Sequence, residues 1–165
     1  MNKAATIVAD LRSKAEARGG DNNALLLDFI DACFNGMPEG VLTSRSPQAL
    51  FASVCEQFDI ICQPRMPGQP RAIIRPLDGS EGRCDMALIT VADDIPFLVD
   101  TVGMAVRQTG AQIDWMMHPG LRVRRDPDGA VQAIHSASES TDHGDEESLI
   151  RLEFAAAAGT DAQAL

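Results

Sequence analysis

Two adjacent aspartates stand where an apolar segment gives way to a helical pattern. Residues 86–91 are apolar, Asp93 and Asp94 follow them, and Pro96 occupies the place of a first helical turn, which needs no amide donor. Carboxylates at such a strand-to-helix junction either accept hydrogen bonds from the free amides of the first turn or contribute to a small-molecule site. The residue types alone favour the cap, so we predict that Asp93 or Asp94 caps the helix.

A pair of arginines lies further along the chain. Arg122 and Arg124 lie on either side of Val123, and side chains two positions apart share one face of a strand. Two guanidinium groups side by side can hold a carboxylate or a phosphate, so Arg122, Arg124 and His118 are the candidates for an anion site or a contact between domains. The alternative is a solvated strand face, or an ionic contact with another part of the protein, and we favour this alternative. Local acids that could pair with the arginines include Asp126, Glu153 and Asp114.

The residues that catalysis would need are missing from the sequence. His118 has no nucleophile or acid partner nearby, so we interpret it as a hydrogen-bonded residue at a strand end. There is no Gly-x-Gly-x-x-Gly turn for a dinucleotide, and the only lysines are Lys3 and Lys14. The acidic cluster at 142–147 is interpreted as a charged loop rather than a metal site. We therefore predict no catalytic residue, no metal and no cofactor in this chain.

The elements that position these residues fall into three segments. In residues 1–63, apolar residues recur at helical spacing in three stretches, the last beginning at Ser46 and Pro47, which predicts a small helical subdomain. Residues 64–84 are rich in proline and predict a loop-rich connector with one short strand at 71–75. A short strand is also predicted at 60–62.

Residues 85–165 predict a sheet with one helix. The expected order is a strand to Val91, a helix at 96–109, a strand at 111–118, a hairpin of 121–125 and 130–135, and a last strand at 149–154. Asp126-Pro127-Asp128-Gly129 supplies the hairpin turn. Residues 136–146 predict a loop. The fold class is therefore α+β.

Composition excludes several partners. Fourteen Lys and Arg against 24 Asp and Glu give a net charge of -10, which is the wrong sign for binding nucleic acid. No apolar run approaches the ~20 residues of a membrane span, and the first residues lack a secretion signal, so we expect a cytoplasmic protein with no membrane contact. The cysteines show no Cys-x-x-Cys spacing and predict reduced, packed thiols; they are Cys33, Cys55, Cys62 and Cys84.

Several motifs in succession carry a family resemblance. They are Asp-Asp-Ile-Pro-Phe-Leu-Val-Asp-Thr-Val at 93–102, His-Pro at 118–119, Val-Arg-Arg-Asp at 123–126 and the Glu-Ser strand at 147–154. With these motifs, residues 64–154 resemble the amino-terminal region of the large bacterial NAD-dependent glutamate dehydrogenases. The resemblance implies an ACT-type, ferredoxin-like domain over residues 85–165, with β-α-β-β order and a second helix truncated at the chain end.

The resemblance also implies a function. The parent enzymes oxidise L-glutamate to 2-oxoglutarate and ammonia with NAD, and the missing residues place catalysis outside this chain. Related ACT domains hold amino-acid effectors at the first strand–helix turn, often with a glycine after the proline. The candidate effector site is therefore Asp93, Asp94, Pro96 and Phe97. Because Phe97 stands where that glycine would be, our hypothesis is that this domain has lost the effector and kept a packing role.

One flank of the predicted helix at 96–109 indicates an interface. Phe97 and Met104 extend apolar character beyond the side needed for the sheet, and Gly103 would permit close approach of another backbone. We predict that this flank contacts the helical subdomain or a second protein chain. The expected partners are the remainder of the parent chain, further copies in a homo-oligomer, and an amino-acid effector as an option.

We therefore predict a non-catalytic region of a glutamate dehydrogenase that serves packing and assembly, with regulation as an added role. The alternative is a stand-alone ACT-type module that senses an amino acid. A third option is a small enzyme in its own right.

Overall fold

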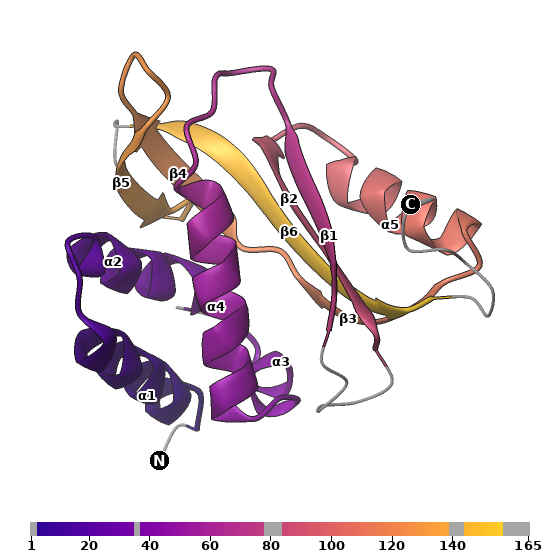
Figure 1. Cartoon of the computed structure of the whole chain (residues 1–165), viewed down its shortest axis with the longest axis horizontal. Helices are drawn as coiled ribbons and strands as arrows, with labels where there is room; N and C mark the ends of the chain where they lie inside the picture. Colours follow the sequence, from indigo (N-terminus) through magenta and orange to yellow (C-terminus); the bar gives the residue numbers. More distant parts are fainter. Residues whose placement is uncertain (1–2, 35–36, 78–83, 139–143, 157–165) are drawn as a thin grey trace.

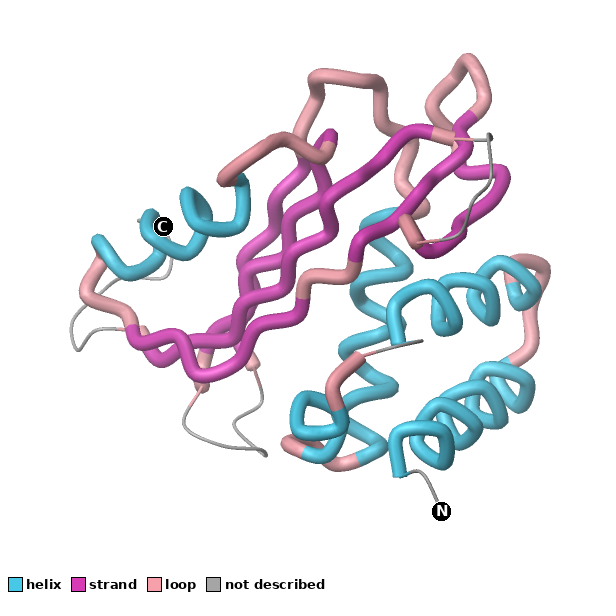
Figure 2. Tube along the Cα trace, turned by 180° about the vertical axis from the view of Figure 1, so that it is seen from behind, coloured by secondary structure: helices cyan, strands magenta, loops and turns pink. Residues whose placement is uncertain are grey.

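The fold is a curved sheet with helices on both faces (Figure 1). The computed structural model describes residues 3–34, 37–77, 84–138 and 144–156. Within these residues, six strands form one sheet, and every pairing between them is antiparallel. Helices α1 to α4 cover one face and α5 covers the other, as the view from behind also shows (Figure 2).

The helical segment begins the chain, and its helices are α1 (Lys3–Arg18), α2 (Asn23–Phe34), α3 (Glu39–Thr43) and α4 (Pro47–Ile61). The three predicted helices are confirmed. Ser46 caps α4 by accepting a hydrogen bond from the Ala49 amide, with Pro47 in the first turn. The short α3 was not predicted. The predicted strand at 60–62 is wrong, because α4 continues to Ile61 and buries Ile60 and Ile61 on its core face.

The remaining elements are β1 (Arg71–Pro76), β2 (Met86–Asp93), α5 (Leu98–Gln108), β3 (Gln112–Met117), β4 (Gly120–Arg125), β5 (Val131–Ser136) and β6 (Asp145–Ala155). Each predicted strand from residue 71 onward is present. The last strand, β6, is longer than predicted and includes the end of the predicted loop at 136–146. Residues 139–143 of that loop lie outside the described residues. The second helix that the resemblance implies, at the chain end, also lies outside them.

Strand β6 organises the sheet. Along one edge it pairs with β2, from Asp93↔Glu147 to Met86↔Phe154. Along its other edge it pairs first with β4 and then with β3. The break between β3 and β4 falls at His118 and Pro119, where proline cannot donate a ladder hydrogen bond. The sheet order is β1-β2-β6-β4-β5, with β3 beside β6.

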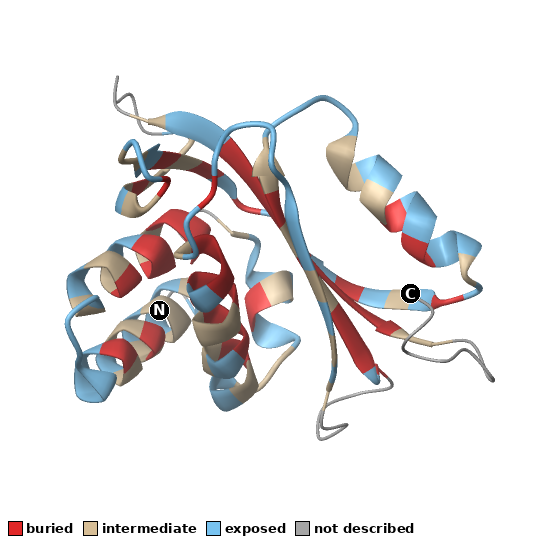
Figure 3. Ribbon diagram, turned by 45° about the horizontal axis from the view of Figure 1, so that its top comes forward, coloured by how far each residue is buried: buried red, intermediate tan, exposed pale blue. Residues whose placement is uncertain are grey.

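The two faces of the sheet bury separate apolar clusters, and Figure 3 shows buried residues in the strands and in the helices on either side. The larger cluster joins α1, α2 and α4 to the sheet and includes Phe29, Val54, Ile89 and Leu149. The smaller cluster lies under α5 and is formed mainly by Val106, Ile150, Leu152 and Phe154. Because both faces are covered, β6 is buried along most of its length. The division at residues 63 and 84 stays a prediction.

The turn between β4 and β5 is the predicted one, and Gly129 is fixed there by two constraints. Its φ is +84°, and a Cβ on Gly129 would lie 2.6 Å from the backbone oxygen of Arg65. The Gly129 oxygen also accepts a hydrogen bond from the Arg65 amide. The turn therefore packs directly on the connector.

We expect Gly129→Ala to lower the free energy of unfolding by at least about 2 kcal/mol, from left-handed strain and displacement of the connector. Gly68→Ala is the matched control, since Gly68 has φ of +75° and open space around it. The control should cost about 1 kcal/mol. Urea denaturation of both variants measures the difference, and equal costs would show that the contact with Arg65 is unimportant.

Candidate functional site

The loop between β2 and α5 has a backbone conformation that its residue type disfavours. Phe97 is the N-cap of α5, with φ of 64° and ψ of 9°, in the left-handed region. Among the described residues it is the only non-glycine residue with positive φ. This conformation costs roughly 1–2 kcal/mol for an L-residue, and the side chain is 78 % exposed, so burial does not offset the cost. The rest of the loop therefore holds Phe97 in a glycine-like shape.

The prediction that Asp93 or Asp94 caps α5 is wrong. The helix begins at Leu98, after Pro96, and its N-cap makes no side-chain hydrogen bond. Asp93 instead accepts hydrogen bonds from the Gly68 amide at 2.6 Å and from Arg65 Nη1 at 2.7 Å. These two donors hold the pKa of Asp93 below its usual value. The capping rule considers only neighbours in the chain, whereas Arg65 is 28 positions from Asp93 and offers it a charge-assisted hydrogen bond.

The same loop borders a hollow of ≈ 350 Å³ that also contains His118. The structure thus brings Asp94, Pro96 and Phe97 together with His118, although the sequence placed them in two groups. His118 Nε2 lies 2.9 Å from Ser148 Oγ, which confirms the prediction of a hydrogen-bonded residue at a strand end. The hollow can offer a small ligand the Asp94 carboxylate and the His118 imidazole.

His118 should make stability depend on pH. Burial of part of the ring lowers the pKa of His118, and the nearby Asp94 carboxylate opposes the shift only in part. The unfolded chain therefore binds the proton more readily than the folded one, and stability falls as pH drops below the usual histidine value of about 6.5. We expect His118→Gln to lose less stability than the unsubstituted protein between about pH 7 and pH 5. Urea midpoints at each pH measure this, and parallel profiles would contradict it.

Next to the loop lies a buried ionic network formed by Arg65, Asp93, Arg125 and Glu147. Arg65 is 4 % exposed and lies 2.8 Å from Glu147, which is 2 % exposed. Arg125 Nε contacts the same carboxylate at 2.7 Å, and its Nη2 donates to the Ile61 carbonyl at 2.9 Å. The network therefore ties the connector, β4, β6 and the end of α4 to the loop after β2. No sequence pattern marks Arg65 or Glu147 as site residues.

The two arginines singled out from the sequence do not form an anion site with each other. Arg122 pairs with Glu146 on the adjacent β6 and also donates to the Gly144 carbonyl. Arg124 is exposed. Arg122 therefore has a local acidic partner, as predicted, but the partner is Glu146 and none of the three acids named from the sequence. Glu146 lies opposite Arg122 because β4 pairs with the first residues of β6.

The flank of α5 is exposed, as expected for an interface, but it does not contact the helical segment. Phe97 and Met104 are 78 % and 55 % exposed, and α5 lies on the opposite face of the sheet from α1 to α4 (Figure 1). A Cβ on Gly103 would meet only Arg107 Nη1, at 3.2 Å, among the described residues. The predicted contact between this flank and the helical segment is therefore wrong. Contact with a second chain stays a prediction.

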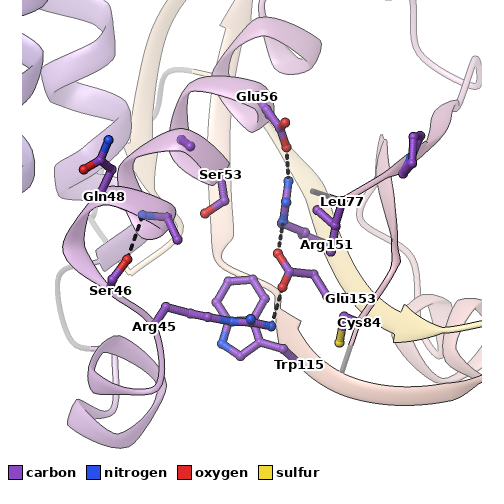
Figure 4. A pocket seen from close by; sticks show the side chains of 13 residues that line it. Arg45, Ser46, Gln48, Ser53, Glu56, Leu77, Cys84, Trp115, Arg151 and Glu153 are labelled. Atoms are coloured by element: carbon purple, nitrogen blue, oxygen red, sulfur yellow. Dashed lines mark hydrogen bonds and ion pairs between the residues drawn. The ribbon is translucent and has the colours of Figure 1, made fainter. Parts of the chain in front are cut away.

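A larger hollow, of ≈ 570 Å³, lies between α4 and the sheet, and the sequence did not predict it (Figure 4). Along its wall, Arg151 pairs with Glu56 at 2.6 Å and with Glu153 at 2.9 Å. Arg45 pairs with the other oxygen of Glu153 and lies over the Trp115 ring at 5.6 Å. In the sequence, Arg151 and Glu153 resemble the solvent face of an edge strand, and only the helical layer above them reveals that they are buried.

The remaining site predictions concern thiols, metals and membranes. All four cysteines are unpaired, and burial raises the pKa of Cys33 and brings that of Cys62 to about 11. In the part of the chain that the structure describes, no group of His, Cys, Asp and Glu could hold a metal ion. Among the same residues, no helix combines the length and apolarity needed to cross a bilayer.

Comparison with known proteins gives one family. A model of the family described as glutamate dehydrogenase, ACT1 domain, matches residues 29–165. The match includes the loop after β2, both hollows and the buried ionic network. No solved structure matches the chain significantly.

Proposed function

The chain belongs to the family of glutamate dehydrogenase ACT1 domains, and from this premise we propose that it is the non-catalytic amino-terminal region of a large NAD-dependent glutamate dehydrogenase. The parent would oxidise L-glutamate to 2-oxoglutarate and ammonia in the cytoplasm. In this proposal NAD and the catalytic residues belong to the remainder of the parent chain. The region itself serves packing and assembly of the enzyme.

The order of elements supports the ACT-type assignment. Strand β2, helix α5, the broken strand β3–β4 and strand β6 come in this order in the chain, with β5 between β4 and β6, and β6 lies between β2 and the β3–β4 pair in the sheet. This is the arrangement of the first β-α-β-β unit of a ferredoxin-like domain. Strand β5 is then an addition beside β4, and β1 occupies the outer position beside β2.

The observation that carries the assembly role is the exposed apolar face beside α5. We define the α5 face as Ile95, Phe97 and Met104, which are 56 %, 78 % and 55 % exposed. The opposite side of α5 is already satisfied by the small core under it. Large apolar side chains gathered on a free helix mark an interaction site more often than scattered ones do. The α5 face is therefore our assigned contact with the rest of the enzyme or with a second copy.

The test uses the full-length enzyme with Met104→Asp. We expect at least a tenfold weaker association of subunits by analytical ultracentrifugation, with loss of glutamate-dependent NAD reduction. Met66→Asp is the matched control, because Met66 is 45 % exposed and belongs to the connector rather than to the α5 face. Unchanged assembly and unchanged activity with Met104→Asp would contradict the proposal. Glutamate-dependent NAD reduction by residues 1–165 alone would contradict the non-catalytic part.

A second candidate function, amino-acid sensing, is favoured by the shape of the loop at Phe97. The left-handed backbone keeps the form that a glycine would give, and the exposed side chain leaves space beside Asp94 and His118. Strained backbone that the surroundings maintain is often linked to function. Calorimetric titration with glutamate and other amino acids tests this candidate. Saturable binding that Asp94→Asn weakens at least tenfold would support the sensing role. The absence of binding would contradict it, and assembly would remain as the proposed function.

A further inference from the structure

Helix α5 carries one acid and one base, and these two residues are too far apart to pair with each other. Asp100 lies in the first turn of the helix and Arg107 in the last. Ion pairs along a single helix join positions three or four apart, whereas these two are seven apart. Both residues are exposed, and within the part of the chain that the structure describes neither forms an ion pair.

The two charged residues share one side of α5 with the apolar residues of the α5 face. Phe97, Asp100, Met104 and Arg107 follow one another at intervals of three, four and three, which places them along one side of the helix. The helix dipole favours an acid in the first turn and a base in the last even in a single chain. It does not account for the exposed Phe97 and Met104, so the side as a whole has the composition of a contact surface.

This order of residues is complementary to itself when two copies of α5 run antiparallel. A two-fold axis that passes midway between Asp100 and Arg107 places Asp100 of each copy opposite Arg107 of the other. Such an isologous contact needs residue i to fit residue j while j fits i, and an acid and a base on one side of a helix meet that condition. In a parallel pair, by contrast, each charged residue would meet its own equivalent.

The middle of such a pair falls at Gly103 and Met104. Gly103 has no side chain, so two backbones can approach closely there. A Cβ on Gly103 would meet Arg107 Nη1 at 3.2 Å, and this guanidinium is the end of a flexible side chain that can turn toward Asp100 of a second copy. Met104 would lie against Met104 of the second copy, and its unbranched side chain adapts readily to such a contact.

The charges around α5 favour the antiparallel arrangement. Asp94 and Asp100 both border the hollow that contains His118, so the amino end of α5 is acidic. The second half of the helix has Arg107 as its single charged residue. An antiparallel pair brings the acidic end of each copy to the basic end of the other and also opposes the two helix dipoles. Because the chain has a net charge of -10, copies otherwise repel each other.

The contact is small. Helix α5 has 11 residues, which makes it about 16 Å long at a rise of 1.5 Å per residue. Stable interfaces between proteins bury about 1,200–2,000 Å², more than one short helix from each copy provides. We therefore expect weak association through α5 in this chain alone, which further contacts in a larger enzyme would strengthen.

We propose that the partner of the α5 face is a second copy of this chain, packed antiparallel through α5, with Asp100 of each copy paired to Arg107 of the other. This inference rests on the assembly role proposed above and names the partner in it. The contact has two-fold symmetry, so every ion pair in it occurs twice.

Charge reversal in the 165-residue chain tests the pairing. We expect sedimentation equilibrium over a series of concentrations to show a weak dimer, which Asp100→Arg and Arg107→Asp each weaken at least tenfold. Each substitution alone sets like charges against each other at both ends of the pair. The combined variant should recover the original association. An equal mixture of the two single variants should recover it as well, because all ion pairs in the mixed dimer join opposite charges.

A matched control separates the pairing from the effect of overall charge. Asp100→Arg reduces the net negative charge of the chain, so reduced repulsion alone would strengthen association, whereas the pairing predicts that it weakens. Asp59→Arg makes the same change at an exposed position of α4, on the opposite face of the sheet from α5 (Figure 1). This control should not weaken the dimer. Thermal unfolding followed by circular dichroism shows whether each variant is folded.

Three outcomes would overturn the proposal: no dimer of the unsubstituted chain across the concentration series, single substitutions without effect, or no recovery in the mixture. These outcomes are distinct from failure of the assembly role. If α5 instead contacts another part of a larger enzyme, the charge reversals leave the 165-residue chain unchanged while Met104→Asp still disturbs the full-length enzyme.

Discussion

Glu147→Gln is expected to lower the free energy of unfolding by about 3–5 kcal/mol. Glu147 is 2 % exposed and shares its carboxylate between Arg65 and Arg125. Glutamine removes the charge and leaves two guanidinium groups that remain buried and ionised. Arg65 then keeps only the partly exposed Asp93 as a charged partner, and its Nε already lacks a partner among the described residues.

The neighbouring residue provides the control for this prediction. Glu146 is 51 % exposed and pairs with Arg122 at the surface, where an ion pair contributes about 0–1 kcal/mol. Glu146→Gln should therefore leave the free energy of unfolding nearly unchanged. Urea denaturation of both variants gives the comparison. If the two substitutions cost the same, the network around Glu147 is not the buried ionic centre described above.

Arg151→Met should destabilise the protein by about 3 kcal/mol, because it leaves the buried Glu153 with only one of its two arginines and separates α4 from β6. Methionine preserves much of the side-chain volume, so the effect reports charge rather than a cavity. The measurement is the free energy of unfolding at neutral pH.

Arg75→Met tests the other arginine that pairs with Glu56, the α4 residue bound by Arg151. Arg75 pairs with Glu56 at 2.8 Å but is 43 % exposed, so its removal should cost no more than about 1 kcal/mol. A cost for Arg151→Met as small as that for Arg75→Met would mean that Arg151 does not hold α4 to the sheet.

The elements that follow local rules could be predicted from the sequence. Helical spacing, the Ser46 cap and the turn at Gly129 depend on neighbours in the chain, and the structure agrees with each. Residues 60–62 predict a strand because the segment is short and apolar, a pattern that is ambiguous between a strand and the end of a helix. In the structure this segment is the end of α4, because Ile60 and Ile61 are buried on the core face of that helix.

The charged parts of the site could not be predicted, because their partners lie far apart in sequence. Asp93 has the position of a helix cap, yet Arg65 from the connector binds it. Arg151 and Glu153 alternate with apolar residues and indicate a strand with one solvated face. Two helical layers cover that strand instead. For the left-handed backbone of Phe97, the only signal is the family resemblance, in which a glycine often follows the proline; the residue type itself gives none.

The central position of β6 affects how the sheet can form. β2, β3 and β4 are all synthesised before it, and each uses β6 as a pairing partner. Until that last described strand leaves the ribosome, the earlier strands have open edges and no common neighbour. Pairings between such distant segments slow folding and expose strand edges to other chains. We therefore expect a nascent chain that stops before residue 145 to need chaperone protection, although its helices are complete.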